Sequence, residues 1–276
     1  MHNSLAQCLR YWSSIAVVAV LSTMLFQPYA LSAESVPVRH IEGTVHGFLV
    51  LRTTEGKEMA VGDLTQIVRG ERVISHLVFH FRDGSLDDET TVFSERGNFR
   101  LLTDHHVQKG PSFPHPLEMS IDARSGRITV HATDKDGKEK VTTDHLDLPP
   151  DLANGLILSL AKNIKPDTPE TKVPMVVATP KPRIVQLVFT PQGEEPLSIA
   201  GSRRKAMRYA VKIELGGVSG VVAPLIGKQP KDIQIWILGG IAPAFVREEG
   251  QLYQDGPIWS IQLTSPVWPQ ASHTRH

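Results

Sequence analysis

Cysteine is almost absent from this chain of 276 residues. The one cysteine, Cys8, precedes an apolar run near the N-terminus, so residues 34–276 contain none. This absence excludes thiol catalysis, disulfide exchange and cysteine-ligated metals from that region, and it leaves no lipobox for a lipid anchor. A chain of this length can bury a hydrophobic core without disulfides.

An excess of charge of either sign is also missing. The chain has 29 Lys and Arg residues against 29 Asp and Glu residues. A near-neutral protein lacks the electrostatic footprint of a protein that binds nucleic acid or an anionic membrane surface. The basic triplet Arg203-Arg204-Lys205 has no interleaved aromatic residues, and we interpret it as a charged turn. We therefore expect no nucleic-acid partner.

Long hydrophobic runs are absent as well. The apolar run Ile15–Phe26 is shorter than the about 20 residues that a membrane-spanning helix needs. It follows a polar segment that contains Arg10, and the small-residue zone Ala30–Ala33 comes after it. This order predicts a cleavable secretion signal over residues 1–33, with an uncleaved anchor as the alternative. We expect a periplasmic or secreted protein that, after cleavage, is not an integral membrane protein.

What the sequence does contain is a series of short alternating segments. Apolar and polar residues alternate in Tyr209–Leu215, His76–Arg82, Arg127–His131 and Trp259–Leu263, which is typical of half-buried strands. Tight-turn dipeptides follow or separate such segments, and these are Asp83-Gly84, Ser125-Gly126 and Asp136-Gly137. The pattern predicts an antiparallel meander with one face in water.

One segment has helical spacing instead. Between Pro150 and Ile164, leucine or isoleucine recurs every fourth residue, and Pro166 provides a stop signal. The Pro-rich stretch 165–183 that follows allows either a subdivision or a single domain. We expect a mainly β fold over residues 34–276: a curved antiparallel sheet, half-barrel or lipocalin-like, with one amphipathic helix packed on it or plugging its mouth.

Catalytic and cofactor motifs are missing. The chain has no H-E-x-x-H, G-x-S-x-G, Walker or G-x-G-x-x-G motif. We therefore expect no enzyme and no cofactor. His105 and His106, which follow Asp104, are the candidates nearest to a metal site. Adjacent residues of a strand face opposite sides, so we expect no metal there. The acidic residues Asp83–Glu89 are interpreted as a hairpin turn.

The C-terminal half resembles a known group of proteins. Its order is a helix region, Leu148–Gly155, then a Pro-rich break and strand pairs that include Ile235-Trp236-Ile237 and Gly256-Pro257-Ile258-Trp259. This order resembles uncharacterised bacterial secreted proteins whose fold is similar to the periplasmic lipoprotein carriers LolA and LolB. The resemblance implies a curved half-barrel with a helix over its concave face and a hydrophobic ligand. It contains no functional motif.

These observations favour an exported, non-catalytic binding protein that carries or sequesters a lipid-like apolar ligand. Curved or closed sheets enclose such ligands readily. The side chains expected to line the cavity are Phe79, Phe81, Leu156, Leu160, Trp236 and Phe245. One alternative is an envelope structural or interaction protein with a filled core, whose Pro-rich loops, such as residues 109–116, dock an envelope partner. A second alternative is a hydrolase that uses His105, His106 and nearby carboxylates.

Overall fold

The computed structural model describes residues 35–133, 137–178, 181–199, 202–214 and 230–264. Residues Glu34–His276 form one compact unit. The elements of the described part are β1 (Val45–Thr53), β2 (Glu58–Arg69), β3 (Arg72–Phe81), β4 (Leu86–Ser94), β5 (Arg100–Lys109), β6 (Leu117–Asp122), β7 (Arg127–Thr133), β8 (Glu139–His145), α2 (Ile157–Asn163), β9 (Thr171–Val177), β10 (Arg183–Ile199), β11 (Ser202–Glu214), β12 (Ile233–Leu238), β13 (Ala244–Gly250) and β14 (Trp259–Thr264).

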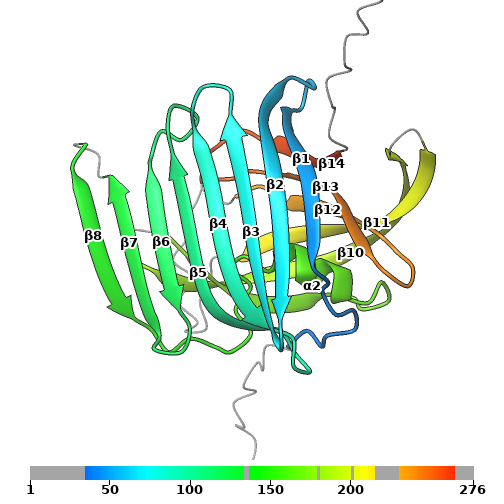
Figure 1. Ribbon diagram of the computed structural model, residues 1–276, viewed down its shortest axis with the longest axis horizontal. Coiled ribbons are helices and arrows are strands. Elements are labelled where there is room, and N and C mark those ends of the chain that lie inside the picture. Colours follow the sequence, from blue (N-terminus) through cyan, green and yellow to red (C-terminus); the bar gives the residue numbers. More distant parts are fainter. Residues whose placement is uncertain (1–34, 134–136, 179–180, 200–201, 215–229, 265–276) are drawn as a thin grey trace, which may run out of the picture. The chain divides into compact units, whose positions relative to one another are not determined.

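All of these strands belong to one 14-stranded antiparallel sheet with the order β8-β7-β6-β5-β4-β3-β2-β1-β14-β13-β12-β11-β10-β9. Two meanders make up the sheet. The first runs from β1 outward to β8, side by side in Figure 1, and the second runs from β9 back to β14. β14 then pairs with β1, and this pairing joins the meanders into one sheet. The predicted fold class, a curved antiparallel sheet with one helix, is confirmed.

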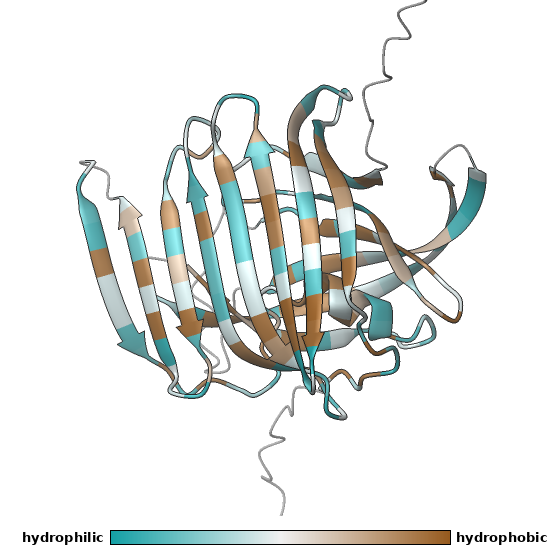
Figure 2. Cartoon of the chain, in the orientation of Figure 1, coloured by the Kyte–Doolittle hydropathy of each residue, from teal (hydrophilic) through white to brown (hydrophobic). Residues whose placement is uncertain are grey.

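The curvature of the sheet places the inner faces of both meanders around one hydrophobic core. This core contains Phe93 and Ile128 from the first meander together with Leu187 and Phe189 from the second. Each such side chain contributes about 1.5–3 kcal/mol on full burial. Figure 2 shows that hydrophobic and hydrophilic residues alternate along β3–β7. Because successive side chains of a strand point to opposite faces, this alternation directs the hydrophobic side chains to the core.

The chain around α2 connects the two meanders within this core. Gly155 lies against the Thr91 side chain of β4, and the Tyr209 hydroxyl of β11 donates a 2.9 Å hydrogen bond to the Ile164 carbonyl oxygen. Leu156 and Leu160, which lie between Gly155 and Ile164 in the sequence, are buried in the core. The expectation that one helix packs on the sheet is confirmed.

The helix is shorter than the sequence predicts. It covers Ile157–Asn163, whereas its spacing predicts a helix over 150–164. The preceding residues turn instead, because Gly155 takes a left-handed backbone conformation (φ 64°). The Asn154 side chain exchanges two hydrogen bonds of 2.9 Å with the backbone of Val176 in β9, which holds this turn against the edge strand. The predicted apolar stripe is nevertheless buried along its whole length.

Most predicted strands are present. His76–Phe81 lies in β3, Arg127–His131 in β7 and Trp259–Leu263 in β14, and β11 contains Tyr209–Glu214, whereas Leu215 lies outside the described residues. Two interpretations were wrong. Arg203-Arg204-Lys205 is part of β11 and not a turn. Asp87–Glu89 lies in β4, because the hairpin turn ends before Leu86.

The outer face of the first meander carries a regular series of polar pairs. A histidine on one strand of each successive hairpin contacts a carboxylate on the next strand. These pairs are His46–Asp63 at 2.8 Å, His76–Asp88 at 3.0 Å, His105–Glu118 at 3.0 Å and His131–Glu139 at 3.4 Å. Such exposed pairs contribute at most about 1 kcal/mol each, so they make the face polar without holding the fold together.

Candidate functional site

The apolar side chains predicted to line a cavity lie in packed surroundings. Five of the six, namely Phe79, Phe81, Leu156, Leu160 and Phe245, are buried in the main core. Trp236 lies in a separate small cluster with Ala206 and Val246. The bulge between Trp236 and Ile237 helps to set this placement. The indole Nε1 of Trp236 donates a 3.0 Å hydrogen bond to Glu195, and the Arg247 guanidinium lies 5.0 Å from the centre of the Trp236 ring. The structure therefore does not bring the six side chains to one place.

The stiff loop 109–116 fills one end of the core. Phe113, flanked by prolines, is only 2% exposed. Its ring centre lies 5.2 Å from that of Phe81, 5.7 Å from Tyr253 and 6.2 Å from Trp259, with edge-to-face geometry in each case. Such contacts stabilise aromatic clusters beyond the burial of their area. The prolines limit the conformations of the loop and so hold Phe113 in this cluster.

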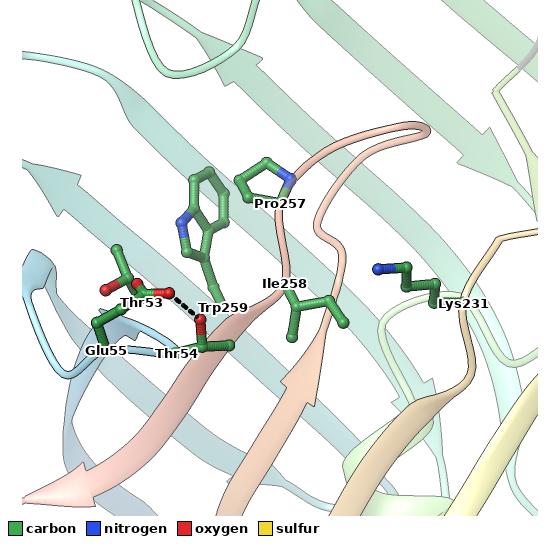
Figure 3. A pocket seen from close by; sticks show the side chains of 7 residues that line it. All are labelled: Thr53, Thr54, Glu55, Lys231, Pro257, Ile258 and Trp259. Carbon is green, nitrogen blue, oxygen red and sulfur yellow. Dashed lines mark hydrogen bonds between the residues drawn. The ribbon is translucent and has the colours of Figure 1, made fainter.

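Two hollows of the described surface are open to solvent. The larger, about 310 Å³, is lined by Thr53, Thr54, Glu55, Lys231, Pro257, Ile258 and Trp259 (Figure 3). Thr54 donates a 2.7 Å hydrogen bond to Glu55 at its rim. The second, about 250 Å³, lies beside Met59 and Arg82. Neither is lined by any of the six predicted residues, and neither is enclosed.

A different set of residues stands out because polar side chains face the apolar core. Asp87, Glu89 and Thr91 of β4 lie directly opposite Gln108, His106 and Asp104 of β5. Asp87 also pairs with Phe79 of β3, a core residue, which identifies the inward face. Glu248 of β13 pairs with the core residues Ile235 and Ile261 and so faces inward from the second meander. We call these residues the polar cluster: Asp87, Glu89, Thr91, Asp104, His106, Gln108 and Glu248.

Hydrogen bonds order part of the polar cluster. His106 Nε2 lies 2.7 Å from Asp87 Oδ1. Gln108 Nε2 donates to Asp87 Oδ2 at 3.3 Å and to the Leu252 carbonyl oxygen at 3.0 Å. Thr91 Oγ1 donates to Asp104 Oδ1 at 2.9 Å. Asp104 is 1% exposed, and its second oxygen, Oδ2, has no hydrogen-bond partner among the described residues.

Burial controls the protonation of the polar cluster. Burial, reinforced by the negative charge of Glu89, raises the pKa of Asp104 to about 8. Burial, with a smaller contribution from Asp87, raises the pKa of Glu248 to about 7. Burial also raises the pKa of Glu89. At neutral pH Asp104 therefore holds a proton that it would lose in water, and Glu248 is partly protonated.

His106 behaves in the opposite way to most buried histidines. Burial lowers its pKa, but the hydrogen bond to Asp87 and the charges of Glu89, Asp87 and Asp104 outweigh burial and raise the pKa to about 9. His106 is consequently a cation at neutral pH. Within the described residues, it is the one cationic side chain that hydrogen-bonds a carboxylate of the polar cluster.

His105 and His106 face opposite sides of β5, as strand alternation predicts. His105 contacts Glu118 on the outer face, whereas His106 contacts Asp87 on the inner face. In the described part of the chain, no group of three or more His, Cys, Asp or Glu side chains is arranged to hold a metal ion. Sequence reasoning assigned Glu89 to a hairpin turn and did not identify Glu248. Glu89 lies among neighbours that are also polar, and Glu248 is far away along the chain.

Among the described residues, no helix has the length and apolar character needed to cross a membrane. Comparisons with known proteins add little. No protein-family model and no curated protein matches the chain. Among solved structures, it is similar to the beta-barrel-like protein of the domain of unknown function DUF1849 from Brucella abortus. The identity is 7% and the TM-score 0.44, and the match covers 83% of this chain and 100% of that one. The resemblance to the carriers LolA and LolB finds no support in these comparisons and stays a prediction.

Proposed function

We propose that this chain is an exported, non-catalytic binding protein that holds a polar ligand at the polar cluster. The observation that carries the proposal is Asp104 Oδ2, a buried oxygen without a hydrogen-bond partner among the described residues, on the same inward face as the half-buried Glu89. The residues 1–33, which have the pattern of a secretion signal, support the exported location.

The free-energy cost of burying the side chains of the polar cluster supports a functional role for them. A buried polar group left without a partner costs about 1–3 kcal/mol, and a folded domain has only about 5–15 kcal/mol of stability. Groups with strongly shifted pKa values concentrate at functional sites for this reason. A ligand that supplies the missing hydrogen-bond donor would recover that free energy as affinity. His106, 21% exposed, and the half-buried Glu89 and Glu248 leave part of the cluster accessible.

Carriage of a lipid-like ligand has less support from the geometry. The side chains predicted for an apolar cavity pack against one another or against Arg247 and Ala206. A filled core is what the alternative, an envelope interaction protein, requires. That alternative, however, gives no reason for acidic side chains to face the core from β4, β5 and β13.

A hydrolase is the second candidate, because His106 and Asp87 form the hydrogen-bonded pair that acid–base catalysis uses. The charge state of His106 argues against it. An imidazole that Asp87 and its neighbours hold protonated at neutral pH cannot accept a proton, so it is a poor general base there. The geometry therefore supports binding better than catalysis.

The test is a ligand screen on protein recovered from the periplasm after expression of the full chain. Melting temperature is measured against a panel of polar and apolar small molecules. We expect stabilising compounds whose effect disappears in the double variant Asp104→Asn, Glu248→Gln. The matched control is Glu118→Gln, which removes a carboxylate on the outer face and should keep every effect. Compounds that stabilise all three proteins equally, or an extractable lipid in native mass spectrometry, would contradict the proposal.

A further inference from the structure

We infer that the ligand group bound by the polar cluster is an organic cation, a protonated amine whose N–H groups donate to the inward carboxylates Glu89, Asp104 and Glu248. This inference rests on the proposed function and names the chemical class of its ligand. It follows from the charges, the free acceptor and the arrangement of the residues.

With all of its carboxyl groups ionised, the polar cluster has more negative than positive charge. Four carboxyl groups face inward, on Asp87, Glu89, Asp104 and Glu248, and His106 is paired with the first of them. Buried charges in folded proteins are normally paired with a charge of opposite sign. In the described residues, Glu89, Asp104 and Glu248 form no ion pair with a lysine or arginine. When these three groups are ionised, the described part of the cluster therefore lacks positive charge.

In the described part of the chain, the strands and the turn around the cluster supply no other charge on the inward face. Glu89 pairs with Leu77 of β3, and Asp104 and His106 pair with Ile121 and Met119 of β6. Glu248 pairs with Ile235 of β12 and Ile261 of β14. The turn before α2, which packs on Thr91, consists of the uncharged residues 152–156. Among the described residues of these elements, the titratable groups that face one another are therefore those of the polar cluster.

The acceptors also favour a donor over a metal ion. Thr91 already occupies Asp104 Oδ1, so Asp104 offers one oxygen, Oδ2. Glu89 lies one pair along the sheet from Asp104, opposite His106. Glu248 of the other meander interacts electrostatically with Glu89 and Asp87. Because the described side chains form no group of ligands suited to a metal ion, directional hydrogen bonds fit better. An ammonium group has three donors and one positive charge, and it can bridge several carboxylates.

Binding of a cation should be linked to proton release. In the protein without a bound cation, these carboxyl groups hold protons, because burial raises the pKa of Glu248 to about 7 and that of Asp104 to about 8. A cation stabilises their charged forms and so displaces those protons. Affinity should therefore increase as the pH rises through these values and level off above them. An anionic ligand would show the opposite dependence, because it needs the protonated carboxyl groups.

The experiment uses isothermal titration calorimetry of the periplasmic protein with four probes of one length. These are pentylamine, the uncharged 1-pentanol, the anion pentanoate, and trimethylpentylammonium, which has the charge but no N–H donor. We expect pentylamine to bind best, with proton release and with affinity that increases by up to about tenfold per pH unit between about pH 6 and 8. Trimethylpentylammonium should bind more weakly, and the other two probes should not bind.

Single substitutions test whether pentylamine binds at the polar cluster. Asp104→Asn and Glu248→Gln should each weaken pentylamine binding at least about tenfold, the scale of one lost charge-assisted hydrogen bond. Both replace a buried carboxyl group by an amide of the same size, so they should fold, which the melting temperature checks. Glu118→Gln should bind like the wild type. Absence of pentylamine binding, or binding unaffected by Asp104→Asn, would overturn the inference. If pentanoate or pentanol binds and Asp104→Asn abolishes this binding, the inference of a cationic ligand is wrong, whereas the proposed function is still supported.

Discussion

At the scale of single residues, Asp104 and His106 show how neighbours decide charge. They are two positions apart on the same face of β5, yet burial keeps a proton on Asp104 and the Asp87 hydrogen bond keeps one on His106. A site built from such groups stores protons at neutral pH. The stability of the fold should therefore depend on pH in a defined direction.

We predict that the protein loses stability as the pH rises from about 6 to about 9. The folded chain holds protons on Glu248, Asp104 and His106 up to about pH 7, 8 and 9, whereas the unfolded chain releases them near 4.5, 3.8 and 6.5. Since the folded state binds more protons in this window, the free energy of unfolding must fall as the pH increases. Urea unfolding at several pH values measures the slope.

The variant Asp104→Asn, Glu248→Gln should flatten that slope and be more stable than the wild type at pH 9 by about 1–3 kcal/mol, because no buried carboxylate forms. Asp88→Asn, on the outer face beside His76, should change stability by less than about 1 kcal/mol. A slope of the same size in the double variant would show that groups other than Asp104 and Glu248 cause it.

The sequence predicts these residues only in part. Alternation correctly places His105 and His106 on opposite faces, because the side-chain period of a strand is fixed. Alternation does not reveal the polar cluster, because β4 carries polar residues on both faces and the sequence pattern therefore does not distinguish its inward face from its outward face. Glu248 joins the cluster only through the curvature of the sheet, which no local pattern encodes.

At the scale of elements, the turn before α2 determines how the connection between the meanders enters the core. Its left-handed residue, Gly155, lies so close to Thr91 that an added Cβ atom would be 1.8 Å from Thr91 Oγ1. Thr91 in turn donates to Asp104. The turn thus fixes a side chain of the polar cluster as well as the start of the helix.

We predict that Gly155→Ala destabilises the protein by about 3 kcal/mol or more, because strain at positive φ of about 1–3 kcal/mol adds to the displacement of Thr91. Gly70→Ala is the matched control. Gly70 has nearly the same φ, 63°, but open space around it, so its cost should stay near 1 kcal/mol. Equal losses of unfolding free energy in urea would show that the contact with Thr91 is unimportant.

The same turn explains why the sequence predicts the helix with the wrong start. Spacing of Leu152, Leu156, Leu160 and Ile164 indicates a buried stripe, and all four are buried. The stripe is continuous although the helix is not, because the residues before Ile157 bond to β9 through Asn154. Burial follows from the sequence pattern, whereas the boundary depends on a tertiary contact.

At the scale of the whole molecule, the two meanders share one sheet and one core. Phe93 of β4 and Phe189 of β10 belong to the same buried cluster, and β1 pairs with β14. The sequence suggests either one domain or a subdivision near 165–183, since a Pro-rich stretch marks linkers as well as edge strands. Pro174 lies in β9 at the edge of the sheet, where a proline interrupts no inner ladder.

We predict one cooperative unfolding transition for the described fold. Phe93→Ala and Phe189→Ala should each lower stability by about 3–5 kcal/mol and shift the whole transition, although they lie in different meanders. Far-ultraviolet circular dichroism, which follows the whole sheet, and tryptophan fluorescence, to which Trp236 and Trp259 of the second meander contribute, should give coincident midpoints. Two separated transitions would indicate that the meanders fold as independent units.

The pairing of β1 with β14 also determines when the sheet can be completed as the chain is made. One side of β1 pairs with β2 soon after both are synthesised, but its other side has to wait for Trp259–Thr264, the last described strand. Until then β1 exposes an unpaired edge, and the second meander has no attachment to the first through the sheet. The sheet therefore cannot be completed before Trp259–Thr264 is available to pair with β1, so a product truncated before this strand would keep an unpaired edge that can associate with other chains.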